Sequence, residues 1–138
     1  MTEDRRGVAV SVGEGASLDI YEKALRAYNI YRGDPVAIID EALADALDFI
    51  IGEIFRAYMH VGLWDETALT EVQAGLSRLK ELAGKSNDRE RAHAAALGDW
   101  AAGDWQGMRA RLDRISMDYP RDLLALQMGH LSDFFHGD

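Results

Sequence analysis

A recurring Gly-Asp turn signal constrains this chain more than any other feature of its sequence. Gly103-Asp104 and Gly137-Asp138 lie 34 residues apart, and Gly33-Asp34 precedes Gly103-Asp104 by 70 residues, close to twice that spacing. A glycine favours the end of one helix, and an aspartate directly after it favours the start of the next. The spacing therefore predicts a unit of two helices joined by a tight turn.

The apolar residues support a helical chain from about residue 17 onward. They recur at intervals of three and four residues, as in Leu69, Val72, Leu76 and Leu79, which is typical of an amphipathic helix. Because most predicted connections are only two to four residues long, consecutive helices must pack antiparallel. The predicted helices are 17–32, 35–47, 49–62, 65–83, 88–102, 105–118 and 121–136.

Two further residues mark the boundaries of the unit in the last third of the chain. Trp105 is a large aromatic residue at the start of a predicted helix, and Pro120 ends that helix. A period of 34 residues with a helix-turn-helix unit is typical of tetratricopeptide repeats. We predict an all-α fold of about seven helices, in which antiparallel pairs over 17–138 stack into a right-handed superhelix. Residues 1–16 are predicted to form an extended or mobile arm.

The sequence also resembles a narrower group, the tetratricopeptide repeat protein 38-like family. The runs NDRERAHAAALGDWAAGDW and DYPRDLLALQMGHLSDFFHGD are similar to the amino-terminal half of that family, as are GVAVSV and YRGDPVAIIDEALA. The resemblance runs from about Arg5 to Asp138, with a departure at Ala46-Leu47, where the family usually has an Asp-Pro helix stop. It implies a helical repeat protein without an established enzymatic activity, and relatives that continue with more helical pairs.

Charge and composition exclude several classes of function. The chain of 138 residues has a formal net charge of −9, which argues against a nucleic-acid-binding surface. It has no cysteine, so disulfides and thiolate metal sites are excluded. The most apolar run, residues 49–63, is too short to span a bilayer, and the first twelve residues lack the apolar core of a signal peptide. We expect a cytoplasmic protein without a membrane partner.

The leading functional prediction is a non-catalytic module that binds a protein or peptide. Stacked helical pairs form a curved surface suited to such partners. The predicted groove residues are Tyr58, Arg89, His93, Trp100 and His130. The simpler interpretation is that the aromatic residues belong to the core, since aromatic residues at helical spacing usually pack.

A second prediction is self-association through the last helix. Without a following helix, its apolar side would be open to a second copy of the chain. The predicted interface of this possible homodimer consists of Leu124, Met128, Leu131, Phe134 and Phe135.

The third and weakest alternative is a metal-dependent or small-molecule enzyme. Its candidates are Glu53, His60, Glu90 and His93, and the acidic-x-x-His spacing recurs at Asp133 and His136. Such short spacings occur freely, so we predict no metal and no cofactor. The simpler interpretations are a surface ion pair between Glu53 and Arg56, a helix cap at Glu90, and a hydrogen-bonded His60 between packed helices.

Overall fold

The computed structural model describes residues 2–3, 6, 9–10, 15–29, 34–45, 49–63 and 67–136. Over these residues the fold is all-α, as predicted, with seven α-helices, one 3₁₀ turn and one minimal strand pair. The elements are β1 (Thr2–Glu3), β2 (Ala9–Val10), α1 (Gly15–Asn29), α2 (Pro35–Asp45), α3 (Ile50–Leu63), α4 (Ala68–Glu81), η1 (Ala83–Lys85), α5 (Asp88–Ala101), α6 (Trp105–Asp118) and α7 (Leu123–His136).

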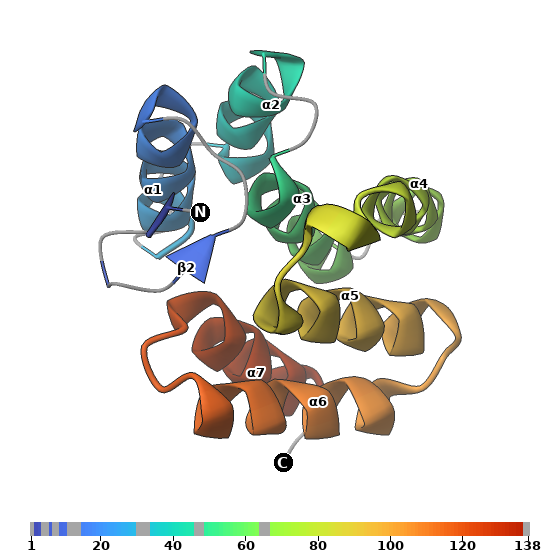
Figure 1. Ribbon diagram of the computed structural model, residues 1–138. Coiled ribbons are helices and arrows are strands. Elements are labelled where there is room, and N and C mark those ends of the chain that lie inside the picture. The colour runs from blue at the N-terminus through green and yellow to red at the C-terminus, as the bar shows by residue number, and fades with distance from the viewer. Residues whose placement is uncertain are drawn as a thin grey trace.

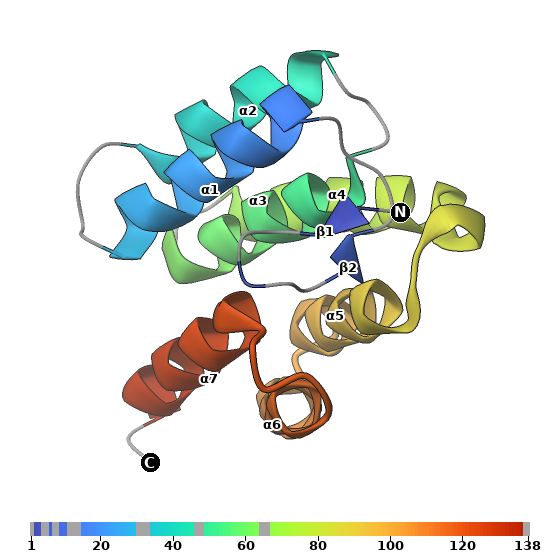
Figure 2. The ribbon, with the colours of Figure 1, turned by 60° about the vertical axis from the view of Figure 1, so that its left-hand side comes forward.

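The odd-numbered and even-numbered helices take different places in the molecule. Helix α1 packs on α2, α3 on α4, and α5 on α6, and each following connection brings the next pair alongside. Helices α1, α3, α5 and α7 form an arc around the strand pair, while α2, α4 and α6 lie outside that arc (Figure 1). A second view confirms that β1 and β2 lie between α1 and α3 on one side and α5 and α7 on the other (Figure 2). We call the surface of the four odd-numbered helices that faces the strands the inner face.

Helix α3 is the centre of the hydrophobic core. It packs against α2, α4, α5 and α7, and nearly every side chain described on it is buried. The ring of Tyr21 on α1 meets the rings of Phe49 and Phe55 edge-on, with centroids 6.2 and 5.9 Å apart. Its neighbours therefore cover α3 on nearly all sides.

Local capping signals explain where several helices begin. The predicted helix cap at Glu90 is confirmed: Asn87 and Glu90 form a capping box at the start of α5, with both reciprocal hydrogen bonds present. Asp104 accepts a hydrogen bond from the Gly107 amide and caps α6. Gly103, just before it, has a φ of 83°, a left-handed conformation that favours glycine. The predicted turn at Gly137-Asp138 lies outside the described residues.

The segment before α1 contains more local order than a simple extended arm. Strand β1 pairs antiparallel with β2, with Thr2 opposite Val10 and Glu3 opposite Ala9. Each strand is only two residues long, so the pair has little stability of its own. Its position on the inner face depends on contacts with the helices.

The packing around Gly52 gives a test of this core. A Cβ atom there would lie 2.6 Å from Cδ2 of Phe49 and 3.3 Å from Cδ2 of Leu43, two buried side chains with little freedom to move. We predict that Gly52→Ala lowers the free energy of unfolding by about 1–3 kcal/mol, because overpacking outweighs the gain in helix propensity. Urea denaturation followed by circular dichroism measures the change.

Gly98→Ala is the matched control for this prediction. Gly98 is also helical, but a Cβ there would meet nothing within 4 Å. This variant should gain about 0.5–1 kcal/mol from helix propensity alone. Equal stabilisation by both alanines would contradict the close packing of α3.

Candidate functional site

Three of the five predicted groove residues meet in one buried polar cluster. The Tyr58 hydroxyl lies 2.6 Å from Nδ1 of His93, and Nε2 of His93 lies 2.7 Å from Oδ2 of Asp122. The same Oδ2 accepts a hydrogen bond from Nη1 of Arg89 at 2.9 Å. All four side chains are at least 95% shielded from solvent. We call these residues the buried cluster.

The buried cluster joins three inner helices. Tyr58 comes from α3, while Arg89 and His93 lie four residues apart on one face of α5. Asp122 immediately precedes α7, and its Oδ1 accepts a hydrogen bond from the Ala125 amide at 3.0 Å. One carboxylate therefore caps α7 and anchors it to α5, and through His93 to α3.

Burial and charge act in opposite directions on the titration of this cluster. Burial alone would raise the pKa of Asp122, but the hydrogen bond and charge of His93 and the charge of Arg89 together lower the pKa well below its ordinary value. Burial, reinforced by the charge of Asp122, raises the pKa of Tyr58 well above its ordinary value. Tyr58 therefore stays protonated, its hydroxyl shares a hydrogen bond with Nδ1 of His93, and Nε2–H of His93 donates to Asp122.

The order Tyr58–His93–Asp122 resembles a catalytic relay, but its surroundings differ from those of an active site. A nucleophile needs a lowered pKa or an active base together with access to substrate. Here the Tyr58 pKa is raised, and both Tyr58 and His93 have 0% of their surface exposed. The arrangement holds helices together, and its chemistry is that of a buried hydrogen-bonded network.

The structure corrects the position of the predicted groove. Tyr58, Arg89 and His93 lie in the interior and do not line an open surface, because each is used in the contact between helices. Trp100 is partly buried and packs edge-on against Trp105, with centroids 6.2 Å apart. The side chain of His130 lies outside the described residues. The core interpretation of these aromatic residues therefore holds for Tyr58.

Asp122 was not predicted as part of any site. The sequence places it two residues after Pro120 and directly before an apolar helix, which is a signal for a helix cap. That signal identifies the cap but gives no indication that the second carboxylate oxygen faces Arg89 and His93, 33 and 29 residues earlier.

The proposed dimer residues divide into two groups. Leu124 and Met128 are buried by the chain's own helices, so in this structure they form part of the core and not an open surface. The side chains of Leu131, Phe134 and Phe135 lie outside the described residues.

The enzyme candidates do not converge on one site. Glu53 pairs with Arg78 on α4 at 2.9 Å, and not with Arg56 as predicted. Glu90 is occupied by its capping box. Neither ring nitrogen of the buried His60 has a hydrogen-bond partner, so the prediction of a satisfied contact is wrong. Among the described residues, no group of three or more acidic, histidine or cysteine side chains is placed to hold a metal ion.

Arg56 instead connects two helices across α3. Its Nε donates to Asp40 on α2 and its Nη1 donates to Glu71 on α4, both at 2.8 Å. The hydrogen bond and charge of Arg56 lower the pKa of Glu71. The long side chain of Arg56 thus forms ion pairs with the two neighbouring helices and not with a residue of its own helix.

The inner face carries a second charged contact, at the strand pair. Arg6 donates through Nη1 and Nη2 to the two carboxylate oxygens of Glu22 on α1, at 3.0 and 2.7 Å. Arg6 also lines a pocket of about 400 Å³ whose other walls are residues at the start of α7: Pro120, Arg121, Leu123 and Leu126. The segment before α1 therefore touches both ends of the helical arc.

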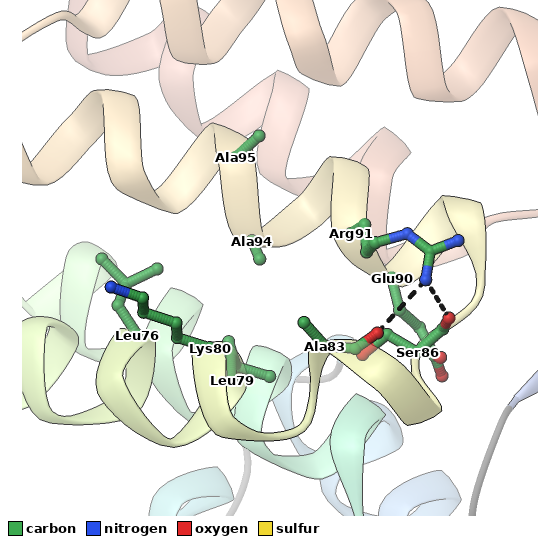
Figure 3. A pocket seen from close by; sticks show the side chains of 9 residues that line it. All are labelled: Leu76, Leu79, Lys80, Ala83, Ser86, Glu90, Arg91, Ala94 and Ala95. Carbon is green, nitrogen blue, oxygen red and sulfur yellow. Dashed lines mark hydrogen bonds between the residues drawn. The ribbon is translucent and has the colours of Figure 1, made fainter.

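A separate groove of about 370 Å³ lies between α4 and α5 (Figure 3). Its walls are mainly apolar, with Leu76 and Leu79 from α4 and Ala94 and Ala95 from α5. At one end Arg91 donates to the carbonyl oxygens of Ala83 and Ser86, so this cation stabilises the turn between the helices.

Comparison of the chain with known family models, curated proteins and solved structures finds no significant match. The resemblance to the tetratricopeptide repeat protein 38-like family therefore stays a prediction. Among the described helices, none is both long and apolar enough to cross a membrane.

The Tyr58–His93 contact generates one prediction. Tyr58→Phe removes the hydroxyl and leaves Nδ1 of a fully buried histidine without its partner. We expect the free energy of unfolding to fall by about 1–3 kcal/mol. Urea denaturation measures this, with Tyr119→Phe, outside the cluster, as the control. An unchanged midpoint for Tyr58→Phe would contradict the contact.

The lowered pKa of Asp122 generates a second prediction. A carboxylate whose pKa is lower in the folded than in the unfolded protein stabilises the fold at pH values above its ordinary pKa of 3.8. This stabilisation is lost as the pH falls from there through the pKa of the folded protein. We expect Asp122→Asn to be less stable than the wild type by about 3–5 kcal/mol at neutral pH, because it removes the negative charge that faces the buried Arg89.

The stability difference between the two proteins should depend on pH. From about pH 5 to about pH 3 the difference in free energy of unfolding should shrink by about 1 kcal/mol. Only the wild type has the Asp122 carboxylate, so only the wild type loses its stabilisation as the pH falls. Urea denaturation of both proteins at both pH values gives this difference. Groups that titrate alike in the two proteins do not contribute to it. A constant difference would show that Asp122 is not held ionised.

Proposed function

We propose that this protein is a non-catalytic module of the tetratricopeptide repeat type that binds an extended protein or peptide segment along its inner face. In such modules, paired helices stack so that one helix of each pair lines a concave surface. The alternation of inner and outer helices supports this arrangement (Figure 1). The finer geometry, a right-handed superhelix, is part of the proposal.

The observation that carries the proposal is the strand pair on the inner face. An extended segment already lies between α1 and α3 on one side and α5 and α7 on the other (Figure 2). Its Arg6 side chain is held by Glu22 and lines the pocket at the start of α7. This face is therefore compatible with extended backbone, the form in which many peptide segments are bound.

The character of the polar residues favours binding over catalysis. The Tyr58–His93–Asp122 relay is sealed inside the protein, and its tyrosine is held in the protonated form. Glu53 and Glu90 are engaged in an ion pair and a helix cap. These residues are accounted for by the stability of the fold, which leaves the exposed surfaces for recognition.

Selection from a random-peptide library against the immobilised chain tests this function. Two exposed apolar residues provide a matched pair of variants: Leu126, 48% exposed on the inner pocket, and Met117, 75% exposed on α6. We expect Leu126→Glu to weaken the selected peptides at least about tenfold, which corresponds to about 1.4 kcal/mol. Met117→Glu should bind them like the wild type.

Two outcomes would contradict this function. One is a library that yields no binder. The other is a set of binders with the same affinity for both variants, since those peptides would lie away from the inner face. Fluorescence polarisation gives the affinities, and circular dichroism verifies that each variant is folded.

A further inference from the structure

We propose that the groove between α4 and α5 binds a small amphipathic anion: an unbranched apolar chain that carries one carboxylate, as in a medium-chain fatty acid. The apolar chain lies between the two helices, and the carboxylate meets the ammonium of Lys80 at the edge of the groove. This site is separate from the inner face, so the inference does not rest on the proposed function.

The groove is open because α5 presents short side chains there. Ala94 points from α5 toward α4, where Leu76 and Leu79 form the opposite wall (Figure 3). Leu76 and Ala94 are only partly buried, so both keep apolar surface in contact with water. Covering such surface is favourable in proportion to its area. The groove therefore favours a ligand with an apolar body.

Lys80 supplies a cation without a counter-charge. Among the described residues, its ammonium has no hydrogen-bond or ion-pair partner. No acidic residue stands three or four positions from it in the sequence, where a helix would place such a partner. Its side chain follows the edge of the groove on α4, and the ammonium points away from Arg91 (Figure 3). A carboxylate at that end of the groove gives Lys80 the negative charge that the protein does not provide.

The other two charged residues that line the groove are already engaged. Glu90 is only 1% exposed and accepts a hydrogen bond from the Asn87 amide in the capping box. Arg91 pairs with Asp88 at 2.6 Å and donates to backbone carbonyl groups of the turn. Of the charges in the groove, that of Lys80 is therefore the one available to a ligand.

The volume of the groove sets the size of the ligand. It is about 370 Å³, near the lower end of the range for small-molecule sites. A water-sized group occupies about 30 Å³, so this space holds about twelve non-hydrogen atoms. A stable complex with a protein segment needs a much larger surface. A medium-chain carboxylate such as decanoate fits the volume, and a ligand of this size should bind with a dissociation constant on the order of 1 mM.

Titration of the isotope-labelled full chain with decanoate, kept below its micelle-forming concentration, tests this inference. Two-dimensional NMR spectra follow each amide, and we expect saturable shifts at Leu76, Lys80 and Ala94. Butanoate keeps the carboxylate but lacks most of the apolar chain, so it should bind at least about tenfold more weakly. Decylammonium has the apolar chain with the opposite charge, so its affinity at these amides should be at least about threefold lower.

Two pairs of variants separate the charge from the apolar wall. Lys80→Gln should weaken decanoate binding about threefold, whereas Lys23→Gln, which makes the same change at an exposed position on α1, should bind like the wild type. Ala94→Leu fills the groove and should weaken binding at least about tenfold. Ala110→Leu adds the same volume at an exposed position on α6 and should have no effect. Circular dichroism verifies that each variant is folded.

Equal affinities for decanoate and decylammonium would overturn the inference, because the groove would then select only for apolar surface. Shifts confined to the pocket of Leu123 and Leu126, or no saturable shift up to about 10 mM decanoate, would also overturn it. Groove amides that shift with protein concentration alone would show that a second copy of the chain covers the groove instead. The ligand comparisons use the unmodified chain, so they decide the question even where Ala94→Leu fails to fold. The library selection concerns the inner face, and its result is independent of this one.

Discussion

The arrangement of the helices depends on the carboxylate of Asp122. One of its oxygens accepts hydrogen bonds from His93 and Arg89 on α5, and the other caps the start of α7. A buried carboxylate is unfavourable unless its charge and lone pairs are matched, and here two cations or donors and one backbone amide match them. Because His93 also contacts Tyr58, this one charge fixes α7, α5 and α3 to one another.

The direction in which the chain curves follows from these fixed contacts. Helix α3 packs against both α5 and α7, so the odd-numbered helices form an arc and not a flat layer (Figure 1). Helices α1 and α7 are the ends of that arc, and the segment before α1 reaches from Glu22 to the pocket at α7. The buried cluster thus shapes the face on which the extended segment lies, although none of its four residues lines the pocket there.

The helices and many of their ends could be predicted because their signals are local. The capping box of Asn87 and Glu90, the cap at Asp104 and the turn at Gly103 each depend on residues within one turn of helix. The buried cluster could not be predicted, since Tyr58 and His93 are 35 residues apart and meet only after the helices pack. The predicted partner of Arg56 was wrong for the same reason. The prediction chose Glu53, one turn away on the same helix, but Arg56 pairs with residues on α2 and α4.

The two charged contacts of the inner helices, Asp122 with Arg89 and Arg6 with Glu22, join different kinds of element. Asp122 lies between packed helices, and its loss would remove the carboxylate that the buried Arg89 and His93 both contact, so the contact is coupled to the core. The contact of Arg6 with Glu22 uses the same chemistry, but on its basic side it joins a segment of two very short strands. The same guanidinium–carboxylate interaction therefore joins two helices at one site and joins the segment before α1 to a helix at the other.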